Sequence, residues 1–556
     1  MTARKNVLRV IPLGGLDAIG KNMTVFEYGD DMVIVDAGLM FPDVELPGVD
    51  LVLPDYSYVL KRASKLRGIV ITHGHEDHTG ALPYLLKDLG VPVPVLGTKL
   101  TCGLIEGKLA EHNIIKPKLR VIKPGMHVTL GIFGFDFVQT NHSIPDSVAL
   151  LIRTPVGTVL HTGDFKFDQT PIDGKLTDYA ALTKAGKDGI VLLMSDSTGA
   201  ANKGFTRPER EIGRALHEII ENAPQRVIVA SFSSHIHRLQ QVCDAAVACG
   251  RKVVVTGRSM IKNTGIAREL GYLHIDPENI VDAYDAGDLP PEKVVILSTG
   301  SQGEPLSALA RMANGDHRAV SIQVGDTVII SASPVPGNEK AVSRVINRLY
   351  KAGAEVFDKS VADVHVSGHA AAEELKLMLA LTQPRFFMPI HGESRHLYAH
   401  RNIAQAVGMA ERDIFIMDNG DCLEISEKGA RVSEHVPEAG VVYVDGLHVG
   451  DVGDVVLRDR QKLSSDGIAT IVVAIDQRTR KVVGEPELVV RGLPMAESAE
   501  ILDQARARIV KALARMEKEG VTDSGIIQRA IRDALSQFVW ETLRRRPMII
   551  PVIMEV

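Results

Sequence analysis

The 556-residue sequence has few cysteines, no long apolar run and no excess of basic charge. Its four cysteines (Cys102, Cys243, Cys249 and Cys422) form no CxxC pair, which excludes a disulfide scaffold and favours a reducing compartment. No run of about 18 apolar residues occurs, so we expect no membrane span. The start, MTARKNVLRVIPLGG, has too short an apolar run for a signal peptide, and we expect a cytoplasmic protein.

The formal net charge of −6 argues mildly against a nucleic-acid partner, because phosphate binding usually leaves a basic footprint. The net charge of the chain, however, does not show how the charges are distributed over its surface. A cleft can be basic while the outer faces are acidic, and bound divalent metals add positive charge that composition does not count. The length exceeds what one hydrophobic core can fill, so several domains are expected.

Short β-branched runs alternate with glycine-rich turns over the first 200 residues. The pattern predicts buried strands at 31–38, 67–73, 134–142, 157–164 and 189–196. Four of these five runs end on a His or an Asp. Polar groups at strand ends are typical of a rigid scaffold with a functional edge.

The pattern of apolar runs and turns changes near residue 206. Strand-like and helix-like segments then alternate up to about 357, which predicts a doubly wound α/β unit. A further block follows an expected linker at 441–460. It contains a predicted hairpin (467–476 and 481–492), an amphipathic helix closed by Gly520, a second helix near 524–543 and a closing strand.

The segment THGHEDHTGA (72–81) follows directly on an apolar strand and contains four potential metal ligands: His73, His75, Asp77 and His78. Imidazole and carboxylate are preferred ligands for zinc and similar ions. A lone His-x-His is weak evidence, since such histidines are usually structural. Four ligands packed into six residues after a buried strand indicate a metal site.

Three further candidates stand at other strand ends: His142, Asp164 and His391. Together with the first cluster they complete a set for two ions. We expect His73, His75 and His142 on one ion, Asp77, His78 and His391 on the other, and Asp164 between them. Two divalent ions suit phosphodiester hydrolysis, because they lower the pKa of a bridging water and neutralise charge on phosphorus. Asp77 could additionally orient the hydroxide. Zinc is the first choice, with manganese or magnesium as alternatives.

These motifs, with IHGE at 390–393, resemble the metallo-β-lactamase superfamily. Asp164 and His391 are far apart in sequence but must share one site, so the α/β block between them must be an insertion. The resemblance implies an αββα sandwich (1–205 and 358–440), an inserted doubly wound β-CASP domain (206–357) and a small C-terminal α/β domain (461–556).

The inserted domain resembles the β-CASP branch, whose members act on nucleic acids. Asp196 in SDST (195–198) matches its first motif, His369 in SGHA (367–370) the second and His391 the third. The resemblance implies that His369, paired with Asp196, lies over the scissile phosphate. It would steady the transition state or protonate the leaving oxygen.

Within that branch, the chain is similar to the ribonuclease J family. The similarity rests on PLGGLDAIGKN (12–22), TGRSMIKN (256–263), STGSQGEPLSALARMA (298–313), PVPGNE (334–339) and HVSGHAAAEELK (365–376). It implies a metal-dependent ribonuclease for single-stranded RNA, with 5′→3′ exonuclease and some endonuclease activity. It also implies roles in ribosomal RNA maturation and messenger RNA decay. A homo-oligomer (dimer or tetramer) is expected, and other RNA-decay proteins or the ribosome are further candidate partners.

A pocket for the RNA 5′-monophosphate is also implied. The small residues of HVSGH can form a nest of backbone N–H groups around a phosphate. The inserted domain would contribute from SFSSHIHR (231–238), although its serines could equally be a helix N-cap. The candidate residues are His365, Val366, Ser367, Gly368, His369, Ser233, Ser234 and His235, with Arg238 nearby.

Three alternatives stay open. A structural cation could lie between Asp50 and Asp445, although a solvated acidic loop fits the same residues. A small-molecule hydrolase acting on a thioester or lactam would use the same metals, but the insertion and the SDST and SGHA motifs speak against it. A non-catalytic RNA-binding subunit would not need the seven intact ligands.

Overall fold

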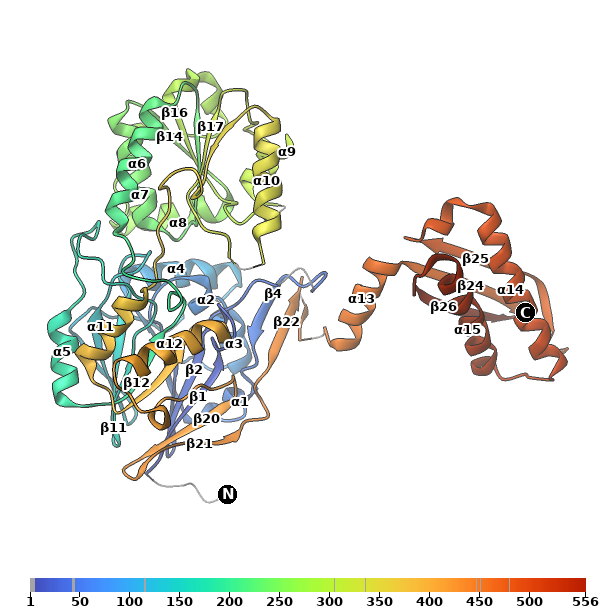
Figure 1. Ribbon diagram of the computed structural model, residues 1–556, viewed down its shortest axis with the longest axis horizontal. Coiled ribbons are helices and arrows are strands. Elements are labelled where there is room, and N and C mark those ends of the chain that lie inside the picture. Colours follow the sequence, from blue (N-terminus) through green and yellow to red (C-terminus); the bar gives the residue numbers. More distant parts are fainter. Residues whose placement is uncertain are drawn as a thin grey trace. The chain divides into compact units, whose positions relative to one another are not determined.

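The structure is a computed structural model of the chain. It describes all residues except 1–5, 43–45, 115–116, 305, 336, 447, 451 and 480, and it describes only the backbone of 454 and 497. The chain divides into two compact units, residues 1–41 with 52–441 and residues 42–51 with 442–556. Figure 1 shows the elements of each unit, and each is treated by itself.

The first unit is built on two sheets. The larger has eight strands in the order β21-β20-β1-β2-β3-β5-β6-β7. Their bounds are Gly429–His435, Asp421–Ser426, Leu8–Gly14, Met23–Tyr28, Asp31–Val35, Leu66–Val70, Val95–Gly97 and Leu119–Val121. Strands β3, β5, β6 and β7 run parallel, so the loops after them emerge at one edge.

The second sheet has six strands in the order β19-β12-β11-β10-β9-β8. Their bounds are Phe386–Ile390, Ile190–Asp196, Gly157–His161, Val148–Thr154, Phe133–Gln139 and His127–Leu130. Strands β12 and β19 pair in parallel although the whole insertion separates them in sequence. This pairing brings the ends of β12 and β19 to the same edge.

The two sheets pack face to face, with Phe26 and Val33 of the first in one core with Phe135 and Leu150 of the second. Helices cover both outer faces. On the first sheet these are α1 (Ser57–Leu60), α3 (Leu82–Leu89) and α4 (Lys99–Glu111), and on the second α5 (Tyr179–Asp188), α11 (Ala372–Thr382) and α12 (Ser394–Ala406). The predicted αββα sandwich is therefore confirmed.

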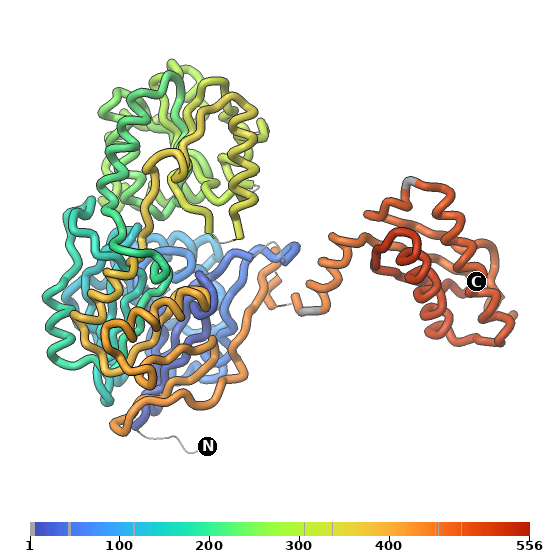
Figure 2. Tube along the Cα trace, in the orientation of Figure 1, coloured from blue at the N-terminus to red at the C-terminus, as the bar shows by residue number. Residues whose placement is uncertain are grey.

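The insertion leaves the sandwich after β12 and returns before β19, as the tube in Figure 2 shows. Its parallel sheet has the order β15-β14-β16-β13-β17-β18, with bounds Ile280–Val281, Lys252–Thr256, Val294–Ser298, Val227–Ala230, Thr327–Ile330 and Glu355–Phe357. Separate cores lie on its two faces, with α6 (Glu209–Asn222), α7 (Ile236–Ala248) and α8 (Arg258–Glu269) in one and α9 (Ala308–Asn314) and α10 (Glu339–Lys351) in the other. The predicted doubly wound unit is confirmed.

The second unit contains the predicted hairpin, β24 (Ile468–Ile475) and β25 (Val482–Arg491), and the closing strand β26 (Met548–Glu555), which pairs in parallel with β24. Helices α14 (Ala499–Lys518) and α15 (Ser524–Leu543) pack on this sheet. The segment 441–460, which the sequence predicts to be a linker, has regular secondary structure in places. It contains β22 (Val441–Asp445), β23 (His448–Val449) and the start of α13 (Asp454–Asp466), whose Leu457 is buried.

Within the part of the chain that the structure describes, none of the helices has the length and apolar character that a bilayer span requires. Cys102, Cys243 and Cys422 are buried free thiols, whereas Cys249 is partly exposed.

Candidate metal centre

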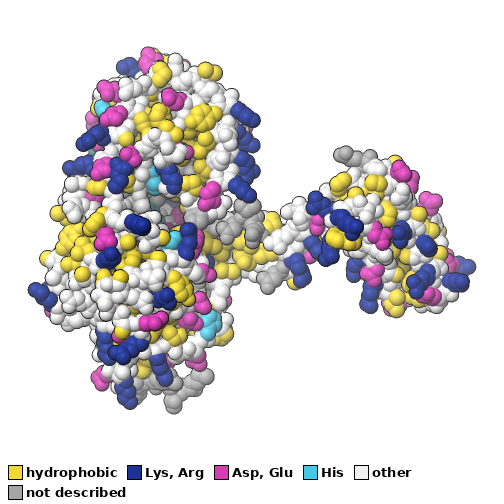
Figure 3. Space-filling model, viewed as in Figure 1, with side chains coloured by type: hydrophobic (Ala, Val, Ile, Leu, Met, Phe, Trp, Pro, Cys, Tyr) yellow, Lys and Arg dark blue, Asp and Glu magenta, His cyan; other side chains and the backbone are white. Residues whose placement is uncertain are grey.

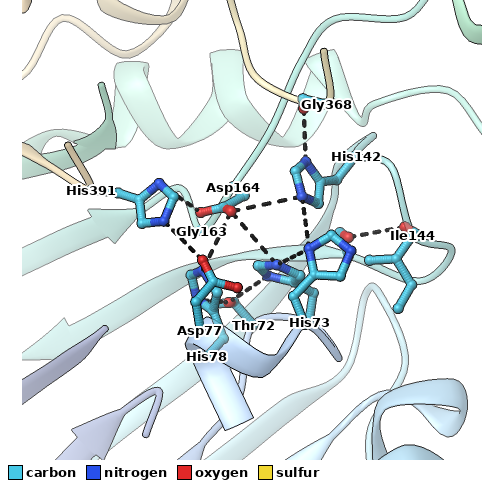
Figure 4. Close-up of polar contacts among 12 residues, drawn as sticks. Thr72, His73, Asp77, His78, His142, Ile144, Gly163, Asp164, Gly368 and His391 are labelled. Atoms are coloured by element: carbon cyan, nitrogen blue, oxygen red, sulfur yellow. Dashed lines mark hydrogen bonds and ion pairs between the residues drawn. The ribbon is translucent and has the colours of Figure 1, made fainter. Parts of the chain in front are cut away.

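The candidate ligands all follow strand ends of the sandwich. His73 and His75 stand between β5 and the short helix α2 (Glu76–Thr79), which contains Asp77 and His78. His142 lies three residues beyond β9, Asp164 three beyond β11, and His391 directly after β19. Figure 4 shows how the labelled ligand side chains, those of His73, Asp77, His78, His142, Asp164 and His391, converge. In the space-filling view, histidine side chains are visible at the junction of the sandwich and the inserted domain (Figure 3).

The first ligand group contains three histidines and one carboxylate. His75 Nδ1 lies 3.1 Å from His73 Nε2 and 3.2 Å from His142 Nε2. Asp164 Oδ2 lies 3.6 Å from His73 Nε2. The four ligand atoms lie within 4.8 Å of one another, so one ion can contact all of them.

The second group shares Asp164 with the first. His78 Nε2 lies 3.3 Å from Asp164 Oδ2 and 3.5 Å from Asp77 Oδ2, and His391 Nε2 lies 3.2 Å from Asp77 Oδ2. Asp164 Oδ1 is buried and accepts no hydrogen bond from the described residues. A buried carboxylate oxygen without a donor fits a cation ligand, and membership of both groups suits Asp164 to a bridging position.

Burial lowers the pKa of the His73 and His142 imidazoles well below the ordinary value, and lowers that of His75 to about 4. Their nitrogens are therefore neutral and available as ligands. Burial also opposes protonation of His391, but Asp164 and Asp196 outweigh it and raise the pKa of His391 to about 10. Cation binding at this position must therefore displace a proton.

Several hydrogen bonds fix the orientation of the ligands. His142 Nδ1 donates to the Gly368 carbonyl at 2.7 Å, and His78 Nδ1 donates to Asp36 Oδ2 at 2.8 Å. Since the His142 Nδ1 carries the proton, its Nε2 lone pair faces the site. Burial opposes protonation of His78, but Asp164, Asp77 and Asp36 outweigh it and hold its pKa well above the ordinary value, so a cation bound at His78 Nε2 would displace a proton. Thr72 Oγ1 also donates to Asp36, at 2.9 Å.

His391 adopts a left-handed backbone conformation with φ of 54°, which non-glycine residues rarely do. The Thr198 hydroxyl holds it there, because Oγ1 lies 3.0 Å from the His391 carbonyl and 2.8 Å from its Nδ1. Sequence reasoning missed the positioning role of Asp36, Thr72 and Thr198. Asp36 had a usable signal, since it ends a buried strand as the ligands do.

The structure brings Asp196 and His369 together beside the ligand groups. His369 Nδ1 lies 2.8 Å from Asp196 Oδ2 and 4.0 Å from Asp164 Oδ2. Burial opposes protonation of His369, but Asp196 outweighs it and raises the pKa of His369. The imidazolium can therefore donate a proton near neutral pH. Its side chain is one-fifth exposed, which leaves an edge open to a ligand.

The HVSGH segment surrounds His369. Ser367 Oγ accepts the backbone N–H of His369 at 3.1 Å, Val366 is buried, and His365 Nδ1 is a buried atom without a hydrogen bond to the described residues. Gly368 approaches the ligand His142 so closely that a Cβ there would lie 2.7 Å from the ring. The segment is thus tied directly to the ligands.

The SFSSHIHR segment contacts the residue directly before HVSGH, Val364, through Arg238. This buried guanidinium donates from Nη1 to the Val364 carbonyl at 2.7 Å and from Nε to Glu209 Oε1 at 2.6 Å. His235 is buried, with Nε2 3.4 Å from the same Glu209 oxygen. Ser233 Oγ accepts a hydrogen bond from Asn263 Nδ2, and no described side-chain hydrogen bond involves Ser234. Neither serine caps α7.

The candidate cation position in the second unit already holds a positive charge. Asp445 pairs with the guanidinium of Arg460, and Asp50 Oδ2 accepts the backbone N–H of Gly446 at 2.8 Å. Among the described residues, no group of three metal ligands forms there. The guanidinium of Arg460 thus supplies, beside Asp445, the positive charge that a bound cation would bring.

An αββα sandwich with clustered His and Asp side chains at one edge defines a metal-dependent hydrolase of the metallo-β-lactamase class. Four family models match the chain: the metallo-beta-lactamase superfamily at 16–204, the ribonuclease J beta-CASP domain at 224–349, the Zn-dependent metallo-hydrolase RNA specificity domain at 355–417 and the ribonuclease J C-terminal domain at 455–556.

The chain belongs to the ribonuclease J family. It is 43% identical to Ribonuclease J of Mycolicibacterium smegmatis, covering 99% of this chain and 97% of that protein. It is 42% identical to Ribonuclease J2 of Bacillus subtilis, covering 99% of both chains. A solved structure of a protein of unknown function from Enterococcus faecalis shares the fold, with a TM-score of 0.54 at 15% identity over 75% of this chain and 100% of that one. The protein is therefore a metal-dependent ribonuclease that binds RNA.

Proposed function

We propose that the enzyme degrades single-stranded RNA in the 5′→3′ direction from a 5′-monophosphate end, and that it also cleaves internally. The observation that carries this proposal is the hydrogen bond between Gly368 of HVSGH and the ligand His142. It holds a loop of small residues at a fixed distance from the ligand groups. A phosphate bound by that loop would set the cutting position by its distance from the site.

In this proposal His73, His75 and His142 would hold one divalent ion and Asp77, His78 and His391 a second, and Asp164, which belongs to both ligand groups, would be shared between them. When bound, the pair of ions, zinc by preference, supplies an activated water near neutral pH and neutralises charge on the phosphate. Asp77 is the least buried of the carboxylates, with 29% of its side chain exposed. That exposure suits it to orient the attacking water.

His369 acts as the proton donor. Asp196 keeps its imidazole protonated and fixes the ring, so the exposed edge can donate to the leaving 3′ oxygen. His365, Ser367 and Gly368 contribute the 5′-phosphate contacts, with Ser233, Ser234 and His235 on the side of the inserted domain. Arg238 lies between these two segments and positions both.

A small-molecule hydrolase or a non-catalytic RNA-binding subunit would not require His369, Asp196 and both ligand groups at one place. We also propose that the enzyme is a cytoplasmic homo-oligomer that acts in ribosomal RNA maturation and messenger RNA decay.

The deciding experiment is digestion of one 5′-labelled RNA and its DNA analogue by purified, metal-loaded protein. Release of labelled mononucleotide from RNA alone supports the proposal for both substrate and direction. Labelled fragments of mixed length without mononucleotide would contradict the exonuclease part.

A further inference from the structure

The inserted domain contains a cavity of about 570 Å³ that none of the proposed metal or RNA contacts line. Strand β14 and helix α8 form one side of it, and residues 280–284 and 317–319 form the other. The floor is apolar and includes Val253 and Val255 of β14 and Leu273. A volume of several hundred Å³ over an apolar floor is typical of a small-molecule site.

The rim of this cavity is cationic. Arg268, Arg311 and Arg318 line it, against a single carboxylate, Asp282. Arg268 and Arg318 are exposed and form no ion pair with the residues that the structure describes. Arg311 is already engaged, because its Nη2 donates to the backbone carbonyl of Asp316 at 2.8 Å and its Nε lies 4.0 Å from Asp316 Oδ1. Among the described residues, the unpaired cations at the rim are therefore Arg268 and Arg318. Guanidinium groups without carboxylate partners suit an anion with several oxygens, such as a phosphate.

A hydroxyl donor stands at the carboxyl end of β14. His317 Nδ1 accepts the backbone N–H groups of Ala319 and Val320, at 3.3 and 3.1 Å, so its Nε2 carries the proton. Nε2 then donates to Thr256 Oγ1 at 3.2 Å, which leaves the Thr256 hydrogen free to donate into the cavity. In doubly wound sheets, ligands bind at the carboxyl ends of the strands.

The lip of the cavity exposes large apolar side chains. Tyr284 is 72% exposed and Ile261 is 56% exposed, and both line the cavity. An aromatic ring and an aliphatic side chain at a concave, cationic site suit the flat face of a nucleobase.

We propose that this cavity binds a nucleoside 5′-monophosphate, with its phosphate on Arg268 and Arg318 and its base against Tyr284 and Ile261. The choice of ligand rests on the proposed function, since 5′→3′ degradation releases nucleoside 5′-monophosphates. The site is separate from the proposed RNA contacts, because none of those residues lines the cavity. Asn263 of α8 donates to Ser233 of the SFSSHIHR segment at 3.0 Å but does not line the cavity.

Gly265 of α8 offers a direct test. It lines the cavity, and a Cβ added there would meet nothing within 4 Å. Gly265→Phe therefore places a bulky ring at the cavity wall without a clash at its Cβ, whereas Gly265→Ala adds one methyl group and is the matched control. A second blocking variant, R268Q/R318Q, removes the proposed phosphate contacts. Its control is Arg214→Gln, at an exposed residue of α6 outside the cavity.

AMP binding to the full-length, metal-loaded protein is measured by calorimetry with the RNA cleft filled by a non-cleavable 5′-monophosphorylated oligonucleotide. The expected result is AMP binding that weakens by at least about tenfold in G265F and in R268Q/R318Q but not in the two controls. Adenosine and inorganic phosphate should each bind far more weakly than AMP. All four variants should still degrade RNA.

AMP binding that is absent once the cleft is filled would overturn the proposal, because AMP would then be a product in the cleft. Equal AMP binding in G265F and G265A would overturn it too, as would equal binding of phosphate and AMP. The two proposals fail separately. RNA degradation without AMP binding contradicts only this inference, and AMP binding without stepwise RNA degradation contradicts only the proposed function.

Discussion

His142 donates a hydrogen bond from Nδ1 to the carbonyl oxygen of Gly368, 226 residues later in the chain, at 2.7 Å. One partner is a candidate metal ligand and the other belongs to the candidate phosphate loop. The bond therefore connects the candidate metal ligands to the candidate phosphate loop, at the point where the chain returns from the insertion to the sandwich.

Gly368→Ala should impair this junction. The new Cβ would lie 2.7 Å from His142 Cε1 and 3.0 Å from Ser143 Cβ, so the loop or the imidazole must move. We expect RNA degradation to fall by about 100-fold, the size of effect that a displacement of about 1 Å produces in a catalytic site. Gly287→Ala, where a Cβ meets nothing within 4 Å, is the control. Activity within twofold of the unaltered enzyme in Gly368→Ala would contradict the role of this contact.

His75→Ala should lower metal content and RNA degradation together, because His75 Nδ1 lies closest to both His73 and His142 among the first ligand group. The measurement is metal content by mass spectrometry beside the cleavage rate, and chelation of the unaltered enzyme should abolish cleavage. His127→Ala, at an exposed histidine, should change neither. Full activity of a metal-free preparation would contradict the metal-dependent account.

Asp36→Asn should weaken metal binding without removing a ligand. The carboxylate accepts the His78 Nδ1 proton, and loss of such a contact typically costs about 10- to 100-fold in metal affinity. Competition with a chelator measures the affinity, and added metal should restore much of the activity. If added metal restores nothing, Asp36 has a role other than holding His78.

Glu209→Gln should destabilise the junction of the two domains in a pH-dependent way. Burial opposes ionisation of Glu209, but Arg238 and His235 outweigh it and hold its pKa well below the ordinary 4.5. Such a group stabilises the fold above pH 4.5, and the contribution is lost as pH falls through the folded-state pKa. We expect a loss of about 3 kcal/mol at pH 7, since the Arg238 guanidinium stays buried. Denaturant unfolding at pH 7 and at about pH 3 measures the difference, which should shrink at the lower pH because that pH lies between the ordinary pKa of Glu209 and its lowered folded-state pKa. A loss that is equal at both pH values would show that the charge of Glu209 is not its cause.

The sequence was sufficient to predict the sandwich, the insertion and the convergence of the ligands. His73, His142, Asp164 and His391 each follow a hydrophobic strand, and strands that run parallel bring such residues to one edge. Three features could not be predicted in the same way. The hydrogen bond between Gly368 and His142 depends on backbone geometry. The contacts of Arg238 depend on how the inserted domain meets the sandwich. The ion pair between Arg460 and Asp445 depends on a helix that begins within the segment predicted as a linker.

The most direct test compares 5′-monophosphorylated with 5′-triphosphorylated RNA of one sequence. If the HVSGH loop binds the 5′-phosphate as proposed, a loop of fixed size beside the candidate metal ligands would accommodate one phosphate and give two further phosphates no partners. We therefore expect faster degradation of the monophosphorylated RNA. Ser367→Val should reduce that preference while the metals stay bound, and His369→Ala should slow both substrates. Equal rates on the two RNAs with the unaltered enzyme would contradict the account and leave HVSGH as a structural turn around His369.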